Sequence, residues 1–274
     1  MESVSKNFGI VEPKTLEGNP RTIFRLSSGV DAREAPAPPP EPLPRHVAIT
    51  PDGNRRWARA HGKSLLEGHA AGTEAFKTIV RHAAERGVKY VSIWGMSLDN
   101  FVRRDPREVA GLLQLFRKEF RSLAADEEIH RQGVHVDVLG RWREKFPLPV
   151  RRSIEQAIDA TKDYGNLFLN IFLAYSGTDE MLEAVRRIAS ESRRASRLHI
   201  TPALIKQHLF TRDLPPVDLL IRTGGEPHLS AGFMMWDVAD AQLFFTEKYW
   251  PEFTPGDFDR ALAQYAQRER RFGG

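Results

Sequence analysis

The chain has 274 residues, of which 41% are hydrophobic and 28% are charged, a composition typical of globular proteins. It contains no cysteine, which excludes disulfides, thiolate metal sites and a cysteine nucleophile. The formal net charge of +4 suits anionic ligands, and no uninterrupted apolar run approaches the ~20 residues that a transmembrane segment needs.

The first 44 residues are expected to form an N-terminal extension of low order. They carry the Pro-rich run "EAPAPPPEPLP" and show no hydrophobic periodicity. The first residues lack a basic segment followed by an apolar stretch, so we expect no secretory signal. Together with the absence of cysteine, this favours a cytoplasmic protein.

From His46 onward, short β-rich runs alternate with long amphipathic stretches. The predicted strands are residues 46–50, 89–95, 134–140, 167–175 and 217–222. The predicted helices are residues 70–86, 106–132, 149–163, 179–193 and 202–209. In the run "REVAGLLQLFRKEF" the apolar residues recur at steps of three and four, as in a helix that packs on a sheet. This alternation predicts an α/β fold with a mostly parallel sheet and helices on its faces.

The stretch "HVAITPDGNRRWARAHG", residues 46–62, leads from a predicted strand directly into a polar turn. Asp52 follows the strand, and Arg55, Arg56 and Arg59 come directly after the turn. Ligands of open α/β sheets bind beyond the carboxyl ends of the strands, and the start of a helix favours anions. The alternative is an ordinary surface turn with solvated arginines. The more specific interpretation is a junction between strand and helix that binds an anionic ligand, with Asp52 positioned to bind a metal ion.

Two further predicted strands end in polar segments that carry arginine. The segment "MSLDNFVRRDP" follows the second strand, and "TGGEPHLSAG" follows the fifth. The pair Gly224 and Gly225 would let backbone N–H groups approach an anion closely, and guanidinium groups grip phosphate with two parallel hydrogen bonds. A plain turn explains the Gly-Gly pair by itself. Three such strand ends in one sheet favour a phosphate-binding site.

Seven motifs resemble, in the same order, those of the cis-prenyltransferase family, of which undecaprenyl diphosphate synthase is the familiar member. They are "PDGNRRWA", "GHAAG", "SLDNFVRR", "NIFLAYSGTDE", "DLLIRTGGEPHLS", "FFTEKYWPEF" and "RERRFGG". The resemblance implies that residues 45–274 form a catalytic domain. It implies a six-stranded, mostly parallel sheet flanked by helices, with a hydrophobic tunnel. It also implies a homodimer, Mg²⁺, and an allylic diphosphate whose prenyl group is transferred to a small-molecule acceptor.

The resemblance assigns roles to single residues. Asp52 resembles the metal-binding aspartate, and Asp52, Asn100 and Arg103 form the expected catalytic set. The expected substrate-binding residues are Gly53, Asn54, Arg55, Arg56, His69, Ser97, Phe101, Arg222, His228, Ser230, Gln242, Arg271 and Gly273. Ionising an allylic diphosphate develops negative charge on the leaving group, which Mg²⁺ and fixed N–H and guanidinium donors stabilise.

Some positions depart from the family's pattern. The family usually has arginine where this chain has Leu65 and His228, and a metal-binding carboxylate where it has Gln242. Because this region carries one extra residue, Asp237 or Asp240 could replace that carboxylate. In the family, the arginine at position 228 and the carboxylate at position 242 belong to a second diphosphate site, where the acceptor isopentenyl diphosphate binds. Loss of a cation and a metal ligand from that site favours an uncharged acceptor.

The preferred interpretation is a prenyltransferase that ionises a short allylic diphosphate, dimethylallyl diphosphate above all, and prenylates a small aromatic, carbazole-like molecule of specialised metabolism. One alternative is a short-chain, irregular (lavandulyl-type) or polyprenyl diphosphate synthase that uses isopentenyl or dimethylallyl diphosphate. A noncatalytic accessory subunit is a second alternative, against which Asp52 and Arg56 count. No nucleic-acid partner is expected, because no recognised motif or stacking set accompanies the basic residues.

Overall fold

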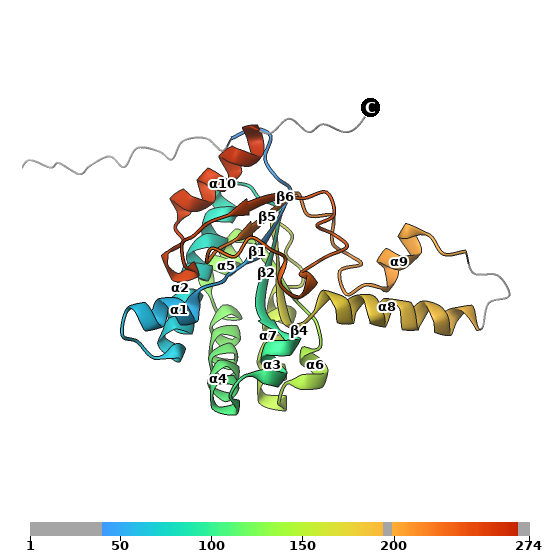
Figure 1. Cartoon of the computed structure of the whole chain (residues 1–274), viewed down its shortest axis with the longest axis horizontal. Coiled ribbons are helices and arrows are strands. Elements are labelled where there is room, and N and C mark those ends of the chain that lie inside the picture. Colours follow the sequence, from blue (N-terminus) through green and yellow to red (C-terminus); the bar gives the residue numbers. More distant parts are fainter. Residues whose placement is uncertain (1–39, 194–198, 268–274) are drawn as a thin grey trace, which may run out of the picture. The chain divides into compact units, whose positions relative to one another are not determined.

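Six strands form one sheet in the order β3-β4-β2-β1-β5-β6, and every neighbouring pair is parallel (Figure 1). The computed structural model describes residues 40–193 and 199–267. The strands are β1 (His46–Thr50), β2 (Tyr90–Ser97), β3 (Val134–Leu139), β4 (Leu167–Tyr175), β5 (Leu219–Arg222) and β6 (Gln242–Phe245). The predicted α/β fold class is therefore confirmed, and the predicted strands agree with β1 to β5 to within two residues.

The helices agree less closely with the sequence pattern. They are α1 (Asn54–Ala60), α2 (Leu65–Glu85), α3 (Leu98–Arg103), α4 (Pro106–Leu123), α5 (Glu127–Gln132), α6 (Trp142–Lys145), α7 (Leu148–Thr161), α8 (Gly177–Ser192), α9 (Pro202–His208) and α10 (Pro255–Gln267). Two short 3₁₀ turns, η1 (Ser230–Gly232) and η2 (Trp250–Glu252), complete the described elements.

Two helix predictions were wrong, one in its middle and one at its start, and side-chain caps explain both. The predicted helix over residues 106–132 is two helices, because the Asp126 carboxylate accepts hydrogen bonds from the N–H groups of Glu128 and Ile129 and starts α5 anew. Helix α2 begins at Leu65 rather than at residue 70, because Ser64 and Glu67 form a capping box.

The sheet is covered on both faces. Successive strand residues alternate between the faces, so Val47 and Ile49 pack in the core beneath α2, α4, α7 and α10, whereas Ala48 packs against the segment 209–241. In Figure 1, α2 and α4 lie to the left of the sheet, and α8 and α9 lie to its right. None of the described helices is both long and apolar enough to cross a bilayer.

The carboxyl edge of the sheet brings distant segments together. Thr50 at the end of β1 is paired with Arg222 at the end of β5, and β2 ends close by at Ser97. Helices α1, α2 and α4 all follow strand ends at this edge and run back along the sheet. Residues 52–56, 97–104 and 222–230 therefore surround one region.

Candidate active site

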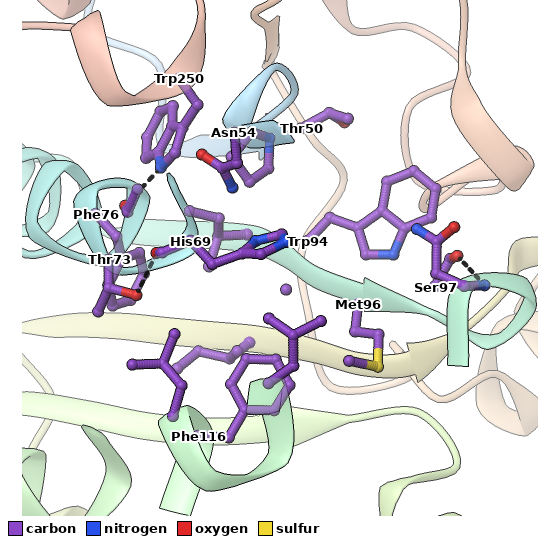
Figure 2. Close-up of a pocket in the computed structure, with 18 of the residues that line it drawn as sticks. Thr50, Asn54, His69, Thr73, Phe76, Trp94, Met96, Ser97, Phe116 and Trp250 are labelled. Carbon is purple, nitrogen blue, oxygen red and sulfur yellow. Dashed lines mark hydrogen bonds between the residues drawn. The ribbon is translucent and has the colours of Figure 1, made fainter. Parts of the chain in front are cut away.

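A cavity of about 260 Å³ extends from the carboxyl edge of the sheet into the space between the sheet and helices α2 and α4. Most of the polar residues that line it come from strand ends and helix starts; these are Thr50, Asp52, Asn54, His69, Ser97, Asn100, Arg104, Arg222 and Ser230, while Thr73 and Glu119 lie within helices. The apolar lining includes Phe76, Ile93, Met96, Leu112, Phe116, Phe120, Leu123 and Ile171. In Figure 2, His69 and Asn54 face Met96 and Phe116 across the open space. The cavity thus has a polar mouth and an apolar interior.

Asp52 lies at this mouth between two arginines. Its Oδ2 accepts a hydrogen bond from Arg222 Nη2 at 3.0 Å, and its Oδ1 lies 3.1 Å from Arg56 Nη2. The backbone is fixed as well, since the Asp52 N–H donates to the Thr223 hydroxyl, which in turn donates to the Asp52 carbonyl. Arg56 Nη1 also lies 3.6 Å from Glu226 Oε1. Counting Arg55 and Arg104 beside Glu108, four arginines face three carboxylates around the mouth, a small excess of positive charge that favours an anionic ligand.

Gly53 makes the turn that leads from Asp52 into α1. Its φ of 107° lies in the left-handed region, and a Cβ at this position would come within 2.9 Å of the Tyr249 backbone. The Arg56 guanidinium lies over the Tyr249 ring, 5.4 Å from its centroid. Only glycine therefore allows the close approach that places Arg56 beside Asp52.

Asn54 reaches into the cavity next to α2. Its buried Oδ1 has no hydrogen-bond partner among the described residues. The space for this amide exists because position 72 is glycine, since a Cβ there would lie 2.4 Å from Asn54 Oδ1. Gly72 is itself held in place, because the Trp250 indole N–H donates to its carbonyl at 2.7 Å. An unpaired amide in a cavity is ready to bind a ligand.

His69, Arg104 and Glu108 form a buried cluster beside Asn54. The Glu108 Oε1 atom accepts a hydrogen bond from Arg104 Nη1 at 3.0 Å and lies 3.6 Å from His69 Nε2. Burial, followed by the charge of Arg104, lowers the pKa of His69 to about 4, although Glu108 acts in the opposite direction. His69 is therefore a neutral imidazole at pH 7. Burial also lowers the pKa of Arg104.

Arg104 was missed by sequence reasoning, which chose Arg103. Arg103 is exposed and does not line the cavity, whereas Arg104 does. The motif "SLDNFVRR" offers two adjacent arginines, and the sequence alone does not show which of them faces the cavity. Counting back from Glu108, which pairs with Arg104 at i,i+4, would have identified the inward-facing arginine.

The other expected site residues divide into two groups. Ser97 and Asn100 line the cavity together, and the Ser97 hydroxyl accepts the Asn100 N–H at the start of α3. Phe101 instead packs against Phe146, with ring centroids 5.6 Å apart, and Arg55 lies 3.9 Å from Glu108 outside the cavity lining.

The structure does not bring His228 and Gln242 to the mouth. The His228 side chain is 59% exposed, and only its backbone carbonyl contributes, by accepting a hydrogen bond from Arg222 Nη1. Gln242 begins β6 opposite Leu219, three residues or about 10 Å before the level of Arg222.

The two suggested replacement carboxylates do not line the cavity either. Asp237 is buried and paired with Lys206, and Asp240 is exposed away from the cavity lining. Within residues 40–193 and 199–267, no three acidic or histidine side chains cluster as a metal site. Arg271 and Gly273 lie outside the described residues.

A cationic mouth above an apolar cavity is the arrangement expected of an enzyme that binds the diphosphate ester of a hydrocarbon. Comparison with known proteins identifies the class. The family model described as "Putative undecaprenyl diphosphate synthase" matches residues 50–273. The chain belongs to the cis-prenyltransferase family and is a prenyltransferase.

Individual relatives are similar over most of the chain. The tritrans,polycis-undecaprenyl-diphosphate synthase (geranylgeranyl-diphosphate specific) of Pyrococcus horikoshii is 40% identical over 233 residues, which are 84% of this chain and 87% of the relative. The isoprenyl transferase of Thermus thermophilus is 42% identical over 238 residues, which are 85% of this chain and 89% of the relative. The crystal structure of lavandulyl diphosphate synthase from Lavandula x intermedia in complex with dimethylallyl diphosphate superposes with a TM-score of 0.79 at 33% identity, covering 85% of this chain and 99% of that one.

Proposed function

We propose that this chain ionises a short allylic diphosphate of the dimethylallyl class and transfers the prenyl group to a second prenyl diphosphate. The observation that carries the proposal is the limited apolar cavity directly behind the cationic mouth. A cavity of about 150 Å³ holds benzene, with six carbons, so at the same density about 260 Å³, which includes the polar mouth, holds at most roughly ten carbons. This matches two isoprene units and is far too small for an undecaprenyl chain.

The donor diphosphate is assigned to the mouth. Arg56 beside Asp52 and Arg104 in the cavity lining supply cations, and Asn54 Oδ1, which has no partner among the described residues, is an acceptor for water bound at the diphosphate. The hydrocarbon then extends along Phe76 and Phe116 into the interior. These apolar walls exclude water, which strengthens the charge interactions at the mouth and protects the cation formed in the reaction.

The residues present fit Mg²⁺, which family membership implies. Mg²⁺ often takes only one or two protein carboxylates and completes its shell with water and substrate phosphates. Asp52 would hold it, because its carboxylate lines the cavity and is one-third exposed, and the ion would take the place of one of the two guanidinium contacts. When bound, the ion stabilises the negative charge that develops on the leaving diphosphate.

In the reaction, the allylic carbon–oxygen bond breaks and its electron pair leaves with the diphosphate. Arg56 and Arg104 stabilise the departing charge through fixed guanidinium donors. Phe76 and Phe116, both in the cavity lining, place aromatic rings beside the prenyl group, and the face of an aromatic ring attracts a cation. The acceptor's double bond then forms the new carbon–carbon bond, and a proton is lost from the acceptor.

The acceptor is assigned to the side of Arg222 and Ser230. Arg222 is buried, with a 4% exposed side chain, and it lies on the opposite side of Asp52 from Arg56. A buried guanidinium supports a diphosphate-bearing acceptor, either isopentenyl or a second dimethylallyl diphosphate. The printed names of the Pyrococcus and lavender relatives support the same class. Family membership is also the basis for expecting a homodimer.

A small aromatic acceptor is the second candidate, and Trp94 is the observation that favours it. The indole stacks on Phe233 with centroids 5.4 Å apart and planes 6° apart, and it lines the cavity. Its buried Nε1–H has no partner among the described residues, so it could donate to a polar group on an aromatic ligand. The exposed His228 side chain leaves the second diphosphate without a nearby additional cation.

The experiment is incubation of the full chain with Mg²⁺ and radiolabelled dimethylallyl diphosphate, alone and with isopentenyl diphosphate or carbazole. The proposal predicts a labelled prenyl diphosphate of about ten carbons when a prenyl diphosphate is the acceptor. Labelled carbazole with no longer diphosphate would favour the second candidate. Transfer to none of these acceptors would overturn both.

A further inference from the structure

The end of the cavity farthest from the mouth carries a charged pair. Helices α2 and α4 both begin near the mouth, where His69 and Glu108 lie, and both run away from it. At 1.5 Å per residue, Lys77 lies about 12 Å beyond His69 on α2, and Glu119 lies about 16 Å beyond Glu108 on α4. Glu119 is therefore deep in a cavity whose walls are otherwise largely apolar.

Glu119 is held in place by Lys77. Its Oε2 atom lies 2.8 Å from Lys77 Nζ, which also lies 2.8 Å from Oε1 of Glu74. Partial burial lowers the pKa of Lys77, but the hydrogen bonds to Glu119 and Glu74 outweigh it and raise the pKa above its usual range. The Glu119 side chain is only 19% exposed. The Glu119 carboxylate therefore borders the cavity as a negative charge, and Lys77 is its counterion.

A second, smaller cavity of about 60 Å³ adjoins the first. Four residues line both, namely Thr73, Phe76, Glu119 and Leu123. They form the partition between the two spaces. Beyond it, the second space is bordered by the apolar side chains of Val80, Ile129 and Leu169 and by polar or charged ones that include Lys77, Arg81, Asp126 and Glu128. A prenyl chain too long for the first cavity would have to pass this partition.

We propose that the Glu119 carboxylate, held by Lys77, sets the maximum length of the prenyl chain that the cavity accepts. This rests on the proposed function, which assigns the cavity to the prenyl chain. Phe76 and Leu123 are apolar and can repack around a longer hydrocarbon at small cost. A hydrocarbon pressed against Glu119 would instead remove water from an ionised carboxylate, which opposes binding strongly. Charge, rather than bulk, closes the cavity.

The test uses the full chain and unreactive thiolodiphosphate analogues of dimethylallyl, geranyl and farnesyl diphosphate, with calorimetric measurement of affinity. The wild type should bind the geranyl analogue at least as well as the dimethylallyl one and gain nothing from the farnesyl tail. Glu119→Leu should bind the farnesyl analogue about tenfold tighter than the wild type, with dimethylallyl affinity unchanged. Glu119→Gln, which keeps the volume and removes the charge, should shift affinity in the same direction.

Glu74→Gln is the matched control, because Glu74 contacts Lys77 but lines neither cavity. It should retain the wild-type dependence on chain length. The inference is overturned if the wild type already gains affinity with the farnesyl tail. It is also overturned if Glu119→Gln keeps the wild-type dependence on chain length, because the charge would then not be what closes the cavity. Failure of the wild type to bind any of the three analogues would contradict the proposed function instead.

Discussion

Gly72→Ala is expected to remove most of the prenyl transfer activity by displacing Asn54. An alanine Cβ at position 72 would lie 2.4 Å from Asn54 Oδ1, 2.9 Å from Cγ and 3.0 Å from Nδ2, whereas ordinary contacts of a Cβ begin at 3.4 Å. The whole amide must therefore move by about 1 Å. A misplacement of this size in a group that positions the substrate can cost about 100-fold in rate.

The same substitution should leave the fold nearly as stable as before. Alanine in a helix interior is favoured over glycine by about 1 kcal/mol, which offsets part of the strain of moving Asn54. Gly111→Ala in α4 is the matched control, because its Cβ would meet only the half-exposed side chain of Leu66, which can move away. Initial rates with radiolabelled dimethylallyl diphosphate and urea unfolding measure the two effects separately.

A double-mutant cycle shows whether Gly72 acts through Asn54. Once Asn54→Ala has removed the amide, Gly72→Ala should have little further effect on the rate. The reasoning is refuted if Gly72→Ala alone stays within a few-fold of wild type. It is also refuted if the two losses multiply, because the glycine would then act on something other than Asn54.

Two further predictions concern Arg104 and His46. Arg104→Lys should lower kcat/KM for the allylic diphosphate by about tenfold or more, because lysine lacks the planar fork, while Arg103→Lys at the exposed neighbour should change little; equal effects would contradict the assignment. Burial lowers the pKa of His46 from 6.5 to about 4, so the unfolded state takes up the proton first as the pH falls. Stability present above pH 6.5 is thus lost toward pH 4, by about 2 kcal/mol at pH 5. Urea unfolding at pH 7 and 5 should show His46→Gln losing about that much less than wild type, and an equal loss would contradict the prediction.

The sequence was sufficient for the fold because long amphipathic patterns alternate with β-branched runs. The predictions of single elements failed where a helix cap or a very short strand determines the boundary. The apolar pattern continues past Leu123, so the new cap at Asp126 was not recognised. Strand β6 is only four residues long and its sequence "QLFF" has no clear turn signals around it, so it was expected only from the family resemblance.

The candidate site was predictable where it follows a strand end directly, as Asp52, Asn54, Ser97 and Arg222 do. It was not predictable where the position of a side chain depends on helix phase or on the pairing of two strands. Of two adjacent arginines, Arg104 rather than Arg103 turns into the cavity, and the pairing of Gln242 with Leu219 places Gln242 at the other end of β6 from the mouth. Trp94 lines the cavity from within a strand, and Glu119 from within a helix, where sequence patterns do not show which side chains border an empty space.

The central claim is that Asp52 and its two arginines form the site at which an allylic diphosphate is ionised. The most direct test is the rate of diphosphate release and prenyl transfer from dimethylallyl diphosphate with Mg²⁺, compared between wild type and Asp52→Asn. The account predicts turnover by the wild type and a loss of about 100-fold or more in the variant. The variant should remain folded, with an unfolding midpoint lowered because buried Arg222 loses its counterion. Turnover by Asp52→Asn within a few-fold of wild type would contradict it.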